Sequence, residues 1–356
     1  MSFKAVITTD IHLRATDKYG KILPNGLNSR LEDTLSHMKK SVDYAIAHNA
    51  DFWICLGDVF DKINPAETLR KAFVEVLAPL IQKKIPIIVL IGNHDTDAKI
   101  YTLMTESSIF NLLDSKAITV LSEPCEMDLG GVSCLMLPWT TDDIIAKQLR
   151  DTKNKIIFGH FGVDGALVSG TEYVLSVGLS QRLFNQHRYA FLGHYHKPQT
   201  AKKWMYIGSL HKVDFGERND KKGFLWLEAS NESIKHKYID VKDRIFFQHK
   251  VVESEDPEFN TIDSWQTLKG HVVKLIFIGE EDWYLRFNLG EIRSKILNKL
   301  GAHKLFLEHQ SMNASRLRVP EIDASSTWGE GIEVYCKKNK RPEMIDLGKS
   351  ILNEVL

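Results

Sequence analysis

Residues 85–95 read Ile-Pro-Ile-Ile-Val-Leu-Ile-Gly-Asn-His-Asp. The run from Ile85 to Ile91 is apolar and rich in β-branched side chains, which is typical of a buried strand. Gly92 then permits a sharp turn and a close approach of the backbone. In open α/β sheets, ligands bind beyond the carboxyl ends of the strands. The segment therefore predicts a buried strand that presents Asn93 and His94 at a functional edge of a sheet.

Four more polar clusters follow short apolar runs in the same manner. They are Asp10-Ile11-His12 after residues 3–7, Gly57-Asp58-Val59-Phe60-Asp61 after 52–56, Gly159-His160 after 156–158, and Gly193-His194-Tyr195-His196 after 189–192. Side chains two residues apart point to the same side of an extended segment, so the D-x-H and H-x-H pairs are expected to project together. If the strands lie side by side, the five clusters meet at one edge.

Each fragment alone also has a plainer interpretation. Gly-Asn-His-Asp fits a turn in which Asn93 takes a left-handed conformation. Asp58 and Asp61 fit a helix N-cap and a favourable charge near the helix dipole. A single histidine such as His160 or His194 is more often a hydrogen-bonded structural residue. The ordered set of five clusters is what favours a metal site.

The side-chain types indicate which cations would bind. Carboxylate oxygen, amide oxygen and imidazole nitrogen without thiolate suit a pair of divalent cations, Mn²⁺ first and also Mg²⁺, Fe²⁺ or Zn²⁺, better than a structural zinc. The four cysteines form no C-x-x-C pair, so we expect neither a disulfide framework nor a thiolate zinc site.

The order of apolar runs predicts an α/β fold. Helical spacing at residues 31–45 and 69–80 alternates with the early strands, which indicates helices covering a sheet. Closely spaced runs at 132–137, 156–158, 189–192, 205–207 and 224–227 predict a second sheet. The expected architecture is a four-layer αββα sandwich over residues 1–245.

The texture of the sequence changes after about residue 241. A polar break at 253–258 precedes an expected strand at 272–278, a helix at 285–300 and a strand at 305–307. These predict a small C-terminal α/β cap domain over 246–335. Residues 336–356 contain a basic run at 337–341 and then a helix, expected from 343 to 356.

Bulk composition adds little about partners. The 356 residues contain 46 Lys and Arg and 46 Asp and Glu, so net charge does not indicate a polyanionic partner. No apolar run approaches the ~20 residues of a membrane span, and no signal peptide is evident. The expected location is the reducing cytoplasm.

The ordered clusters resemble the calcineurin-like metallophosphoesterase superfamily. Within it, the chain looks most like the SbcD family of DNA double-strand-break nucleases, including phage-encoded recombination endonuclease subunits. That likeness extends to Tyr206–Leu210, Asp214–Glu217 and Lys221–Phe224, and covers residues 1–245.

The resemblance implies a role for each cluster. Asp10, His12 and His196 would hold one cation, Asn93, His160 and His194 would hold the other, and Asp58 would bridge them. His94 would face the scissile phosphate as a non-ligand and donate a proton to the leaving 3′ oxygen, and Asp61 would orient it. Asp95 is interpreted as a structural partner of the turn.

The resemblance also implies a function and partners. The expected activity is a Mn²⁺-dependent DNA exonuclease and endonuclease in recombination and repair, acting as a homodimer beside an SbcC-type coiled-coil ATPase. The last helix would dock on that ATPase, or alternatively pack on its own domain. A small-molecule phosphodiesterase or phosphatase is a second interpretation, and a non-catalytic DNA-end scaffold is a third. Lys62 stands where the protein-phosphatase subtype has arginine, which disfavours that subtype.

The resemblance also suggests where DNA and a second copy of the chain would make contact. Arg14, Lys18, Lys21 and Arg30 flank a loop rich in Gly, Pro and Asn, which by analogy would contact the DNA backbone; a solvated basic loop is the alternative. The helix that carries Leu35, Met38 and Val42 is the family-based expectation for the dimer contact.

Overall fold

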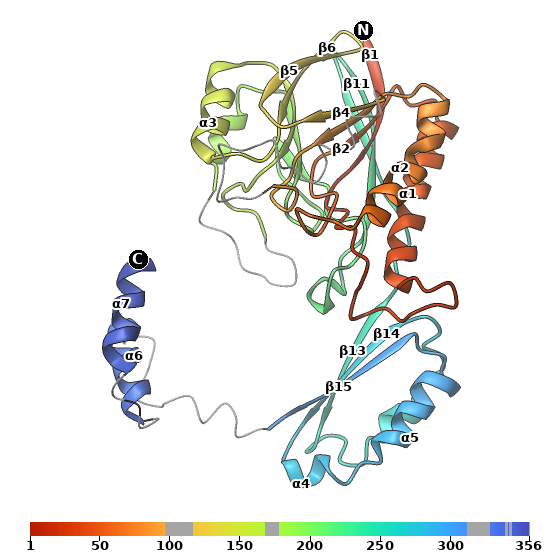
Figure 1. Ribbon diagram of the computed structural model, residues 1–356, viewed down its shortest axis with the longest axis vertical. Coiled ribbons are helices and arrows are strands. Elements are labelled where there is room, and N and C mark those ends of the chain that lie inside the picture. The colour runs from red at the N-terminus through yellow and green to blue at the C-terminus, as the bar shows by residue number, and fades with distance from the viewer. Residues whose placement is uncertain (97–116, 168–177, 312–327, 339–340, 342–343, 356) are drawn as a thin grey trace. The chain divides into compact units, whose positions relative to one another are not determined.

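A computed structural model describes residues 1–96, 117–167, 178–311, 328–338, 341 and 344–355. The chain divides into two compact units, Met1–Phe246 and Phe247–Leu356 (Figure 1). All five polar clusters lie in the first unit. In the described part of the chain, no helix is both long enough and apolar enough to cross a membrane.

The first unit contains two six-stranded mixed sheets. The first has the order β12-β11-β1-β2-β3-β4, formed by Ile234–Asp240, Gly223–Ser230, Ser2–Thr8, Phe52–Cys55, Ile87–Leu90 and Ile118–Leu121. The second has the order β5-β6-β7-β8-β10-β9, formed by Cys125–Leu129, Val132–Leu137, Ile156–His160, Tyr189–Gly193, Trp204–Tyr206 and Gln199–Thr200. Strands β1 to β4 are mutually parallel, as are β6, β7, β8 and β10. Parallel strands end at the same edge, so each sheet gathers the residues that follow its strands.

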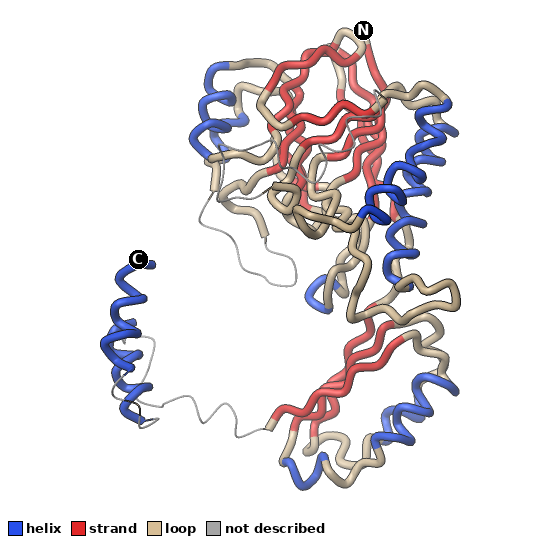
Figure 2. The backbone as a smooth tube through the Cα atoms, in the orientation of Figure 1, coloured by secondary structure: helices blue, strands red, loops and turns tan. Residues whose placement is uncertain are grey.

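Side-chain alternation along the strands builds three layers of core. Ile7 belongs to the core between the two sheets, whereas its neighbour Val6 packs under the helices on the outer face of the first sheet, as the period of two requires. Helices α1 (Ser29–Ala47) and α2 (Glu67–Gln82) cover that face, and α3 (Asp142–Asp151) covers the second sheet. Figure 2 shows these helices flanking the strands. The expected α/β fold is confirmed.

Helix α1 begins where the sequence supplies a cap. The side chain of Asn28 accepts a hydrogen bond from the N–H of Arg30, which satisfies one of the free donors of the first turn. Met38 and Val42, two residues of this helix, are fully buried in the core that it forms with the first sheet. Both side chains therefore belong to the core, and the expectation that the helix region of Leu35, Met38 and Val42 carries a dimer contact stays a prediction.

The second unit begins with a three-stranded sheet of order β13-β14-β15. Its strands are Phe246–Val252, Val272–Ile278 and Lys304–Gln310, with short helices α4 (Glu281–Tyr284), α5 (Leu289–Ser294) and η6 (Lys295–Lys299) between the second and third. The expected single helix at 285–300 is interrupted, since Asn288 caps a new helix by accepting from Gly290 and Glu291. The predicted limits of a cap domain remain predictions.

Beyond this sheet, the described residues form helices α6 (Trp328–Lys338) and α7 (Ile345–Val355). They contact each other through Lys349 and Glu333, whose Nζ and Oε2 lie 3.0 Å apart. Short 3₁₀ helices in the described residues include Gln181–Phe184 (η3), Phe215–Glu217 (η4) and Asn260–Ser264 (η5).

Candidate metal centre

All five clusters lie at the carboxyl ends of parallel strands. Asp10 follows β1, Asp58 follows β2 and Asn93 follows β3 in the first sheet; His160 ends β7 and His194 follows β8 in the second. Their side chains meet across the junction of the two sheets, with His160 Nε2 3.0 Å from Asn93 Oδ1. The sequence-based expectation that distant segments converge here is thus realised in the geometry.

The backbone that carries these side chains is unusual. Asp10, His12, Asp58 and His194 have φ of +48°, +46°, +53° and +97°, a region that non-glycine residues rarely adopt. The expectation of extended D-x-H and H-x-H segments is therefore wrong in detail. Main-chain bonds impose the bend, because the N–H groups of Asp10 and His12 donate to the carbonyls of Gly57 and Asp58. Such conformations persist only where the surroundings enforce them, and they cluster at functional sites.

Two glycines make room for the site. A Cβ on Gly57 would lie 2.6 Å from His160 Nδ1, and one on Gly92 would lie 2.1 Å from Asp58 Oδ1. Gly57 also has φ of +111°. Side chains at either position would displace a candidate ligand, which explains the glycines before Asp58 and Asn93.

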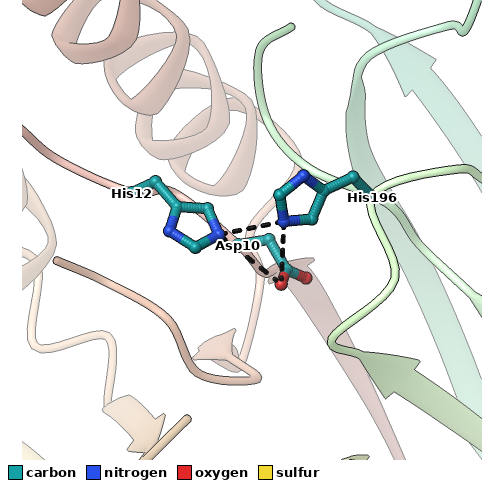
Figure 3. Close-up of side chains that lie close together, drawn as sticks. All are labelled: Asp10, His12 and His196. Carbon is teal, nitrogen blue, oxygen red and sulfur yellow. Dashed lines mark hydrogen bonds and ion pairs between the residues drawn. The ribbon is translucent and has the colours of Figure 1, made fainter. Parts of the chain in front are cut away.

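The first cluster consists of Asp10, His12 and His196 (Figure 3). The Nε2 atoms of the two histidines are 3.0 Å apart, and they lie 4.0 Å and 3.8 Å from Asp10 Oδ1. Figure 3 shows the three side chains pointing toward one another. Asp10 is fully buried and His12 almost so. Three donor atoms facing one another at these separations fit one shared cation.

The second cluster surrounds Asn93. Its Oδ1 lies 2.9 Å from His194 Nδ1 as well as 3.0 Å from His160 Nε2. Asp58 connects the clusters, since its Oδ2 is 3.4 Å from His160 Nε2 and 3.7 Å from His12 Nε2. The donor set is carboxylate, amide oxygen and imidazole, which fits hard or borderline divalent cations at two adjacent positions.

Burial and mutual contact set the protonation of these groups. Burial alone would raise the pKa of Asp58, but His160, His12 and the N–H of His94 hold it well below its usual range. Burial would lower the pKa of His160, yet the Asp58 carboxylate raises it to about 9. Burial lowers the pKa of His194 to about 3. Without a cation, a proton on His160 thus balances Asp58, and cation binding would have to release it.

Two aspartates beside the clusters have separate structural tasks. Asp95 is fully buried, and its carboxylate accepts hydrogen bonds from the N–H groups of Val59, Phe60 and Gly92. It ties the loop after β2 to the loop after β3. Asp61 differs from its expected role: its main-chain carbonyl contacts His94 Nδ1 at 3.2 Å. Its carboxylate instead faces His12 Nδ1 at 3.8 Å and Arg14 at 3.7 Å.

The four basic candidates have different surroundings. Lys18 and Lys21 are exposed. Arg14 is partly buried, and its Nη2 lies 3.0 Å from Asp17 Oδ2. Arg30 is only 1% exposed and pairs with Asp33 and Asp243. The expectation that Arg30 contacts DNA is not supported, because its guanidinium is committed to buried ion pairs.

Three residues at the centre were not predicted as site residues. Glu217 Oε1 lies 2.7 Å from His196 Nδ1, and Lys222 pairs with Glu217. Trp139 packs its ring 5.2 Å from that of His194. The Glu217 and Lys222 segments contributed only to the family resemblance, and nothing in their spacing indicates that they meet His196.

The chain is similar in sequence to a known protein family and to curated proteins. A model of the family described as calcineurin-like phosphoesterase matches residues 3–198. The chain is 26% identical over 271 residues to the SbcD component of the SbcCD nuclease of Staphylococcus saprophyticus, covering 67% of this chain and 69% of that protein. It is 26% identical over 261 residues to the same component from Staphylococcus epidermidis, with coverage of 65% and 67%. A solved dimetal phosphatase from Danio rerio aligns with a TM-score of 0.41 at 10% identity, over 67% of this chain and 96% of that one.

Proposed function

The chain belongs to the calcineurin-like phosphoesterase family, and from that premise we propose that it is a metal-dependent DNA nuclease. The observation that carries the proposal is the pair of clusters joined by Asp58, whose Oδ2 lies within 3.7 Å of an imidazole nitrogen of each. The similarity to the SbcD component of SbcCD nucleases supports DNA as the substrate. The reaction would be hydrolysis of a phosphodiester bond.

The residues of each cluster would hold one of two divalent cations. Asp10, His12 and His196 would bind the first, Asn93, His160 and His194 the second, and Asp58 both. Bound there, the cations would supply the Lewis-acid chemistry that activates a water and neutralises the phosphate. The donor atoms suit Mn²⁺ best and admit Mg²⁺, Fe²⁺ or Zn²⁺.

His94 is positioned to handle a proton beside that centre. It is exposed, its ring centroid is 4.7 Å from that of His12, and its N–H is held by Asp58 Oδ1 at 2.8 Å. The Asp61 carbonyl accepts from Nδ1 at 3.2 Å. This leaves Nε2 to donate to the leaving 3′ oxygen as the bond from phosphorus breaks.

DNA would approach along the loop that follows β1. A cavity of about 560 Å³ is lined in part by Arg14, Lys18 and Asp61, so it adjoins the edge of the first cluster. Exposed lysines and arginines neutralise backbone phosphates without reading sequence. Arg14, Lys18 and Lys21 are therefore assigned to phosphate contact.

The remaining assignments concern assembly. The sheet of the second unit would serve as a cap that restricts the substrate to DNA ends. Met344, just before helix α7, and Leu347 within it are exposed, and this apolar pair would dock on an SbcC-type coiled-coil ATPase. We also propose a homodimer, with its contact outside the buried face of α1.

A nuclease assay with Mn²⁺ tests the proposal. Linear, circular and hairpin DNA are offered beside a generic phosphodiester, with His94→Ala protein as the matched control. The proposal expects DNA cleavage by the unaltered chain and a large loss in the variant. Cleavage of the generic ester without any DNA cleavage would instead favour a small-molecule phosphodiesterase. DNA binding with no hydrolysis of either would favour a scaffold.

A further inference from the structure

A buried ion pair contacts His196 on the side of the ring that faces away from Asp10 and His12. Its Nδ1 lies 2.7 Å from Glu217 Oε1, and the other carboxylate oxygen of Glu217 lies 2.8 Å from Lys222 Nζ. Glu217 and Lys222 are 3% and 1% exposed. Glu217 follows β10 and lies in η4, whereas Lys222 immediately precedes β11. The pair is therefore assembled from two segments behind a single imidazole.

Lys222 is fully engaged at this position. Its ammonium carries three N–H donors, and three acceptors lie 2.8 Å away: Glu217 Oε2, Ser209 Oγ and the carbonyl oxygen of His196. Glu217 Oε2 also accepts from the N–H of Val213 at 2.9 Å. The pair thus fixes both the ring of His196, through Glu217, and its main chain, through Lys222.

The other candidate imidazoles are held differently. His160 Nδ1 contacts the neutral carbonyl of Leu56 at 2.7 Å. His12 Nδ1 is buried without a hydrogen-bond partner, and its nearest carboxylate, that of Asp61, lies 3.8 Å away. Among the candidate imidazole ligands that the structure describes, only His196 has a carboxylate within hydrogen-bond distance of the ring nitrogen that faces away from the clusters. The two cation positions are therefore supported asymmetrically.

We propose that Glu217 is a positioning residue of the metal centre, held by Lys222, that selectively strengthens the cation position shared by Asp10, His12 and His196. The inference rests on the proposed function, because it assumes that the clusters hold cations. A proton fixed on Nδ1 by the carboxylate leaves the Nε2 lone pair directed at Asp10 and His12. A carboxylate partner also makes the imidazole a stronger donor, and loss of such partners typically lowers metal affinity by about 10–100-fold.

A purely structural ion pair would behave differently. A buried pair repays its desolvation only with good geometry, and replacing both charges by apolar groups would then alter folding stability without distinguishing the two cation positions. Selective weakening of one position is therefore the property that separates positioning from structural support.

Calorimetric titration of the full chain with Mn²⁺ alone, with bound metal counted by elemental analysis, tests the inference. Two matched variants remove the charge pair together, so that neither charge is left buried alone: E217L/K222M, which also removes the acceptor for Nδ1, and E217Q/K222M, which retains an amide acceptor. Metal-free denaturant unfolding checks that each variant is folded. E232Q, in the turn between β11 and β12, is the control and should bind as the unaltered chain does.

The expected result is a loss of about 10–100-fold in affinity at one of two Mn²⁺ positions in E217L/K222M, with the other unchanged. E217Q/K222M should lose less. If the folded variants bound Mn²⁺ at both positions as tightly as the unaltered chain, or if both positions were weakened equally, the role of Glu217 would be overturned. The proposed function would remain intact. Unaltered protein that binds no Mn²⁺ would overturn the proposed function and this inference together.

Discussion

The Nδ1 atom of His94 lies 3.2 Å from the main-chain carbonyl oxygen of Asp61. This hydrogen bond is therefore made by the main chain of Asp61 and not by its carboxylate. A carbonyl is present whatever side chain stands at position 61, so the orientation of His94 does not require an acid there. The Asp61 carboxylate has other neighbours, His12 and Arg14, each nearly 4 Å away.

We therefore expect Asp61→Ala to be far milder than His94→Ala. Loss of a positioned proton donor should reduce kcat about 10²–10⁴-fold. Loss of the partly exposed Arg14–Asp61 pair should cost less than about tenfold, since such pairs contribute ~1 kcal/mol or less. Steady-state cleavage at saturating Mn²⁺ compares the two. If Asp61→Ala is as inactive as His94→Ala, the carboxylate is essential after all.

Asp58 should be required for both cations. We expect Asp58→Asn to retain neither Mn²⁺ ion after gel filtration, because a neutral amide replaces the carboxylate shared by the clusters. Asparagine tolerates the left-handed backbone at this position, so the variant should remain folded. Asp43→Asn, on the exposed face of α1, is the control. Two ions retained in Asp58→Asn, measured by elemental analysis, would disprove the bridging assignment.

Sequence patterns located the candidate ligands because each is local to a strand end. Short apolar runs identify where β1, β2, β3, β7 and β8 stop, a glycine marks the end of each except β1, and the polar residues follow directly. The residues of β12, Ile-Lys-His-Lys-Tyr-Ile-Asp, do not predict a strand. Their place in the sheet comes from pairing with β11 over its whole length.

Long-range charge pairing was beyond such patterns. Arg30 lies in a basic, loop-rich segment, which suggests a surface, but its partner Asp243 is 213 residues away in the sequence. Glu217 likewise meets His196 only in the folded chain. The left-handed turns at Asp10 and His12 arise from main-chain bonds to the loop after β2, so no property of either residue alone predicts them.

Asp95 should matter for stability more than for chemistry. Asp95→Ala would leave three main-chain N–H groups, those of Val59, Phe60 and Gly92, without their buried acceptor. Each unsatisfied buried donor costs about 1–3 kcal/mol, so we expect a loss of roughly 3 kcal/mol or more in the free energy of unfolding. Metal-free urea denaturation measures it. Asp95→Asn keeps one acceptor oxygen and should lose less; equal stability of Asp95→Ala and the unaltered chain would refute this role.

His37 should make stability depend on pH. Burial lowers its pKa to about 4; Lys40 and Arg30 act in the same direction, and Asp243 and Asp33 oppose them. The unfolded chain, with a pKa near 6.5, then binds more protons than the folded chain between about pH 4 and 6.5. The contribution of His37 to the free energy of unfolding is therefore fully present above about pH 6.5. It is lost as the pH falls toward 4, which lowers the free energy of unfolding by up to about 3 kcal/mol.

The variant His37→Gln removes this titration. Its free energy of unfolding, measured by urea denaturation at several pH values, should fall less steeply than that of the unaltered chain between pH 6.5 and 4. His236→Gln, at an exposed position on β12, is the control and should change the slope less. Parallel curves for His37→Gln and the unaltered chain would show that His37 does not contribute.

Substitutions of Arg30 and of the exposed lysines should have different effects on stability and on DNA binding. Arg30 donates to Asp33, to Asp243 and, at 2.8 Å, to the carbonyl oxygen of Lys212. Removing one partner of a buried ion pair typically costs about 3–5 kcal/mol. We expect Arg30→Ala to lose stability of that order in urea denaturation, while any folded fraction binds DNA with an unchanged salt dependence.

Lys18→Ala and Lys21→Ala should show the opposite behaviour. Both lysines are exposed, so stability should hardly change, but removing one lysine–phosphate interaction should reduce the slope of log affinity against log salt by about 1. Fluorescence anisotropy with duplex DNA between about 50 and 200 mM salt measures the slope. Lys39→Ala, whose side chain pairs with Asp43 on the exposed face of α1, is the matched control. Arg30 is committed to Asp33 and Asp243, so it should not neutralise a DNA phosphate. If the salt-dependence slope fell in Arg30→Ala but not in the two lysine variants, the phosphate contact would belong to Arg30 and not to Lys18 and Lys21.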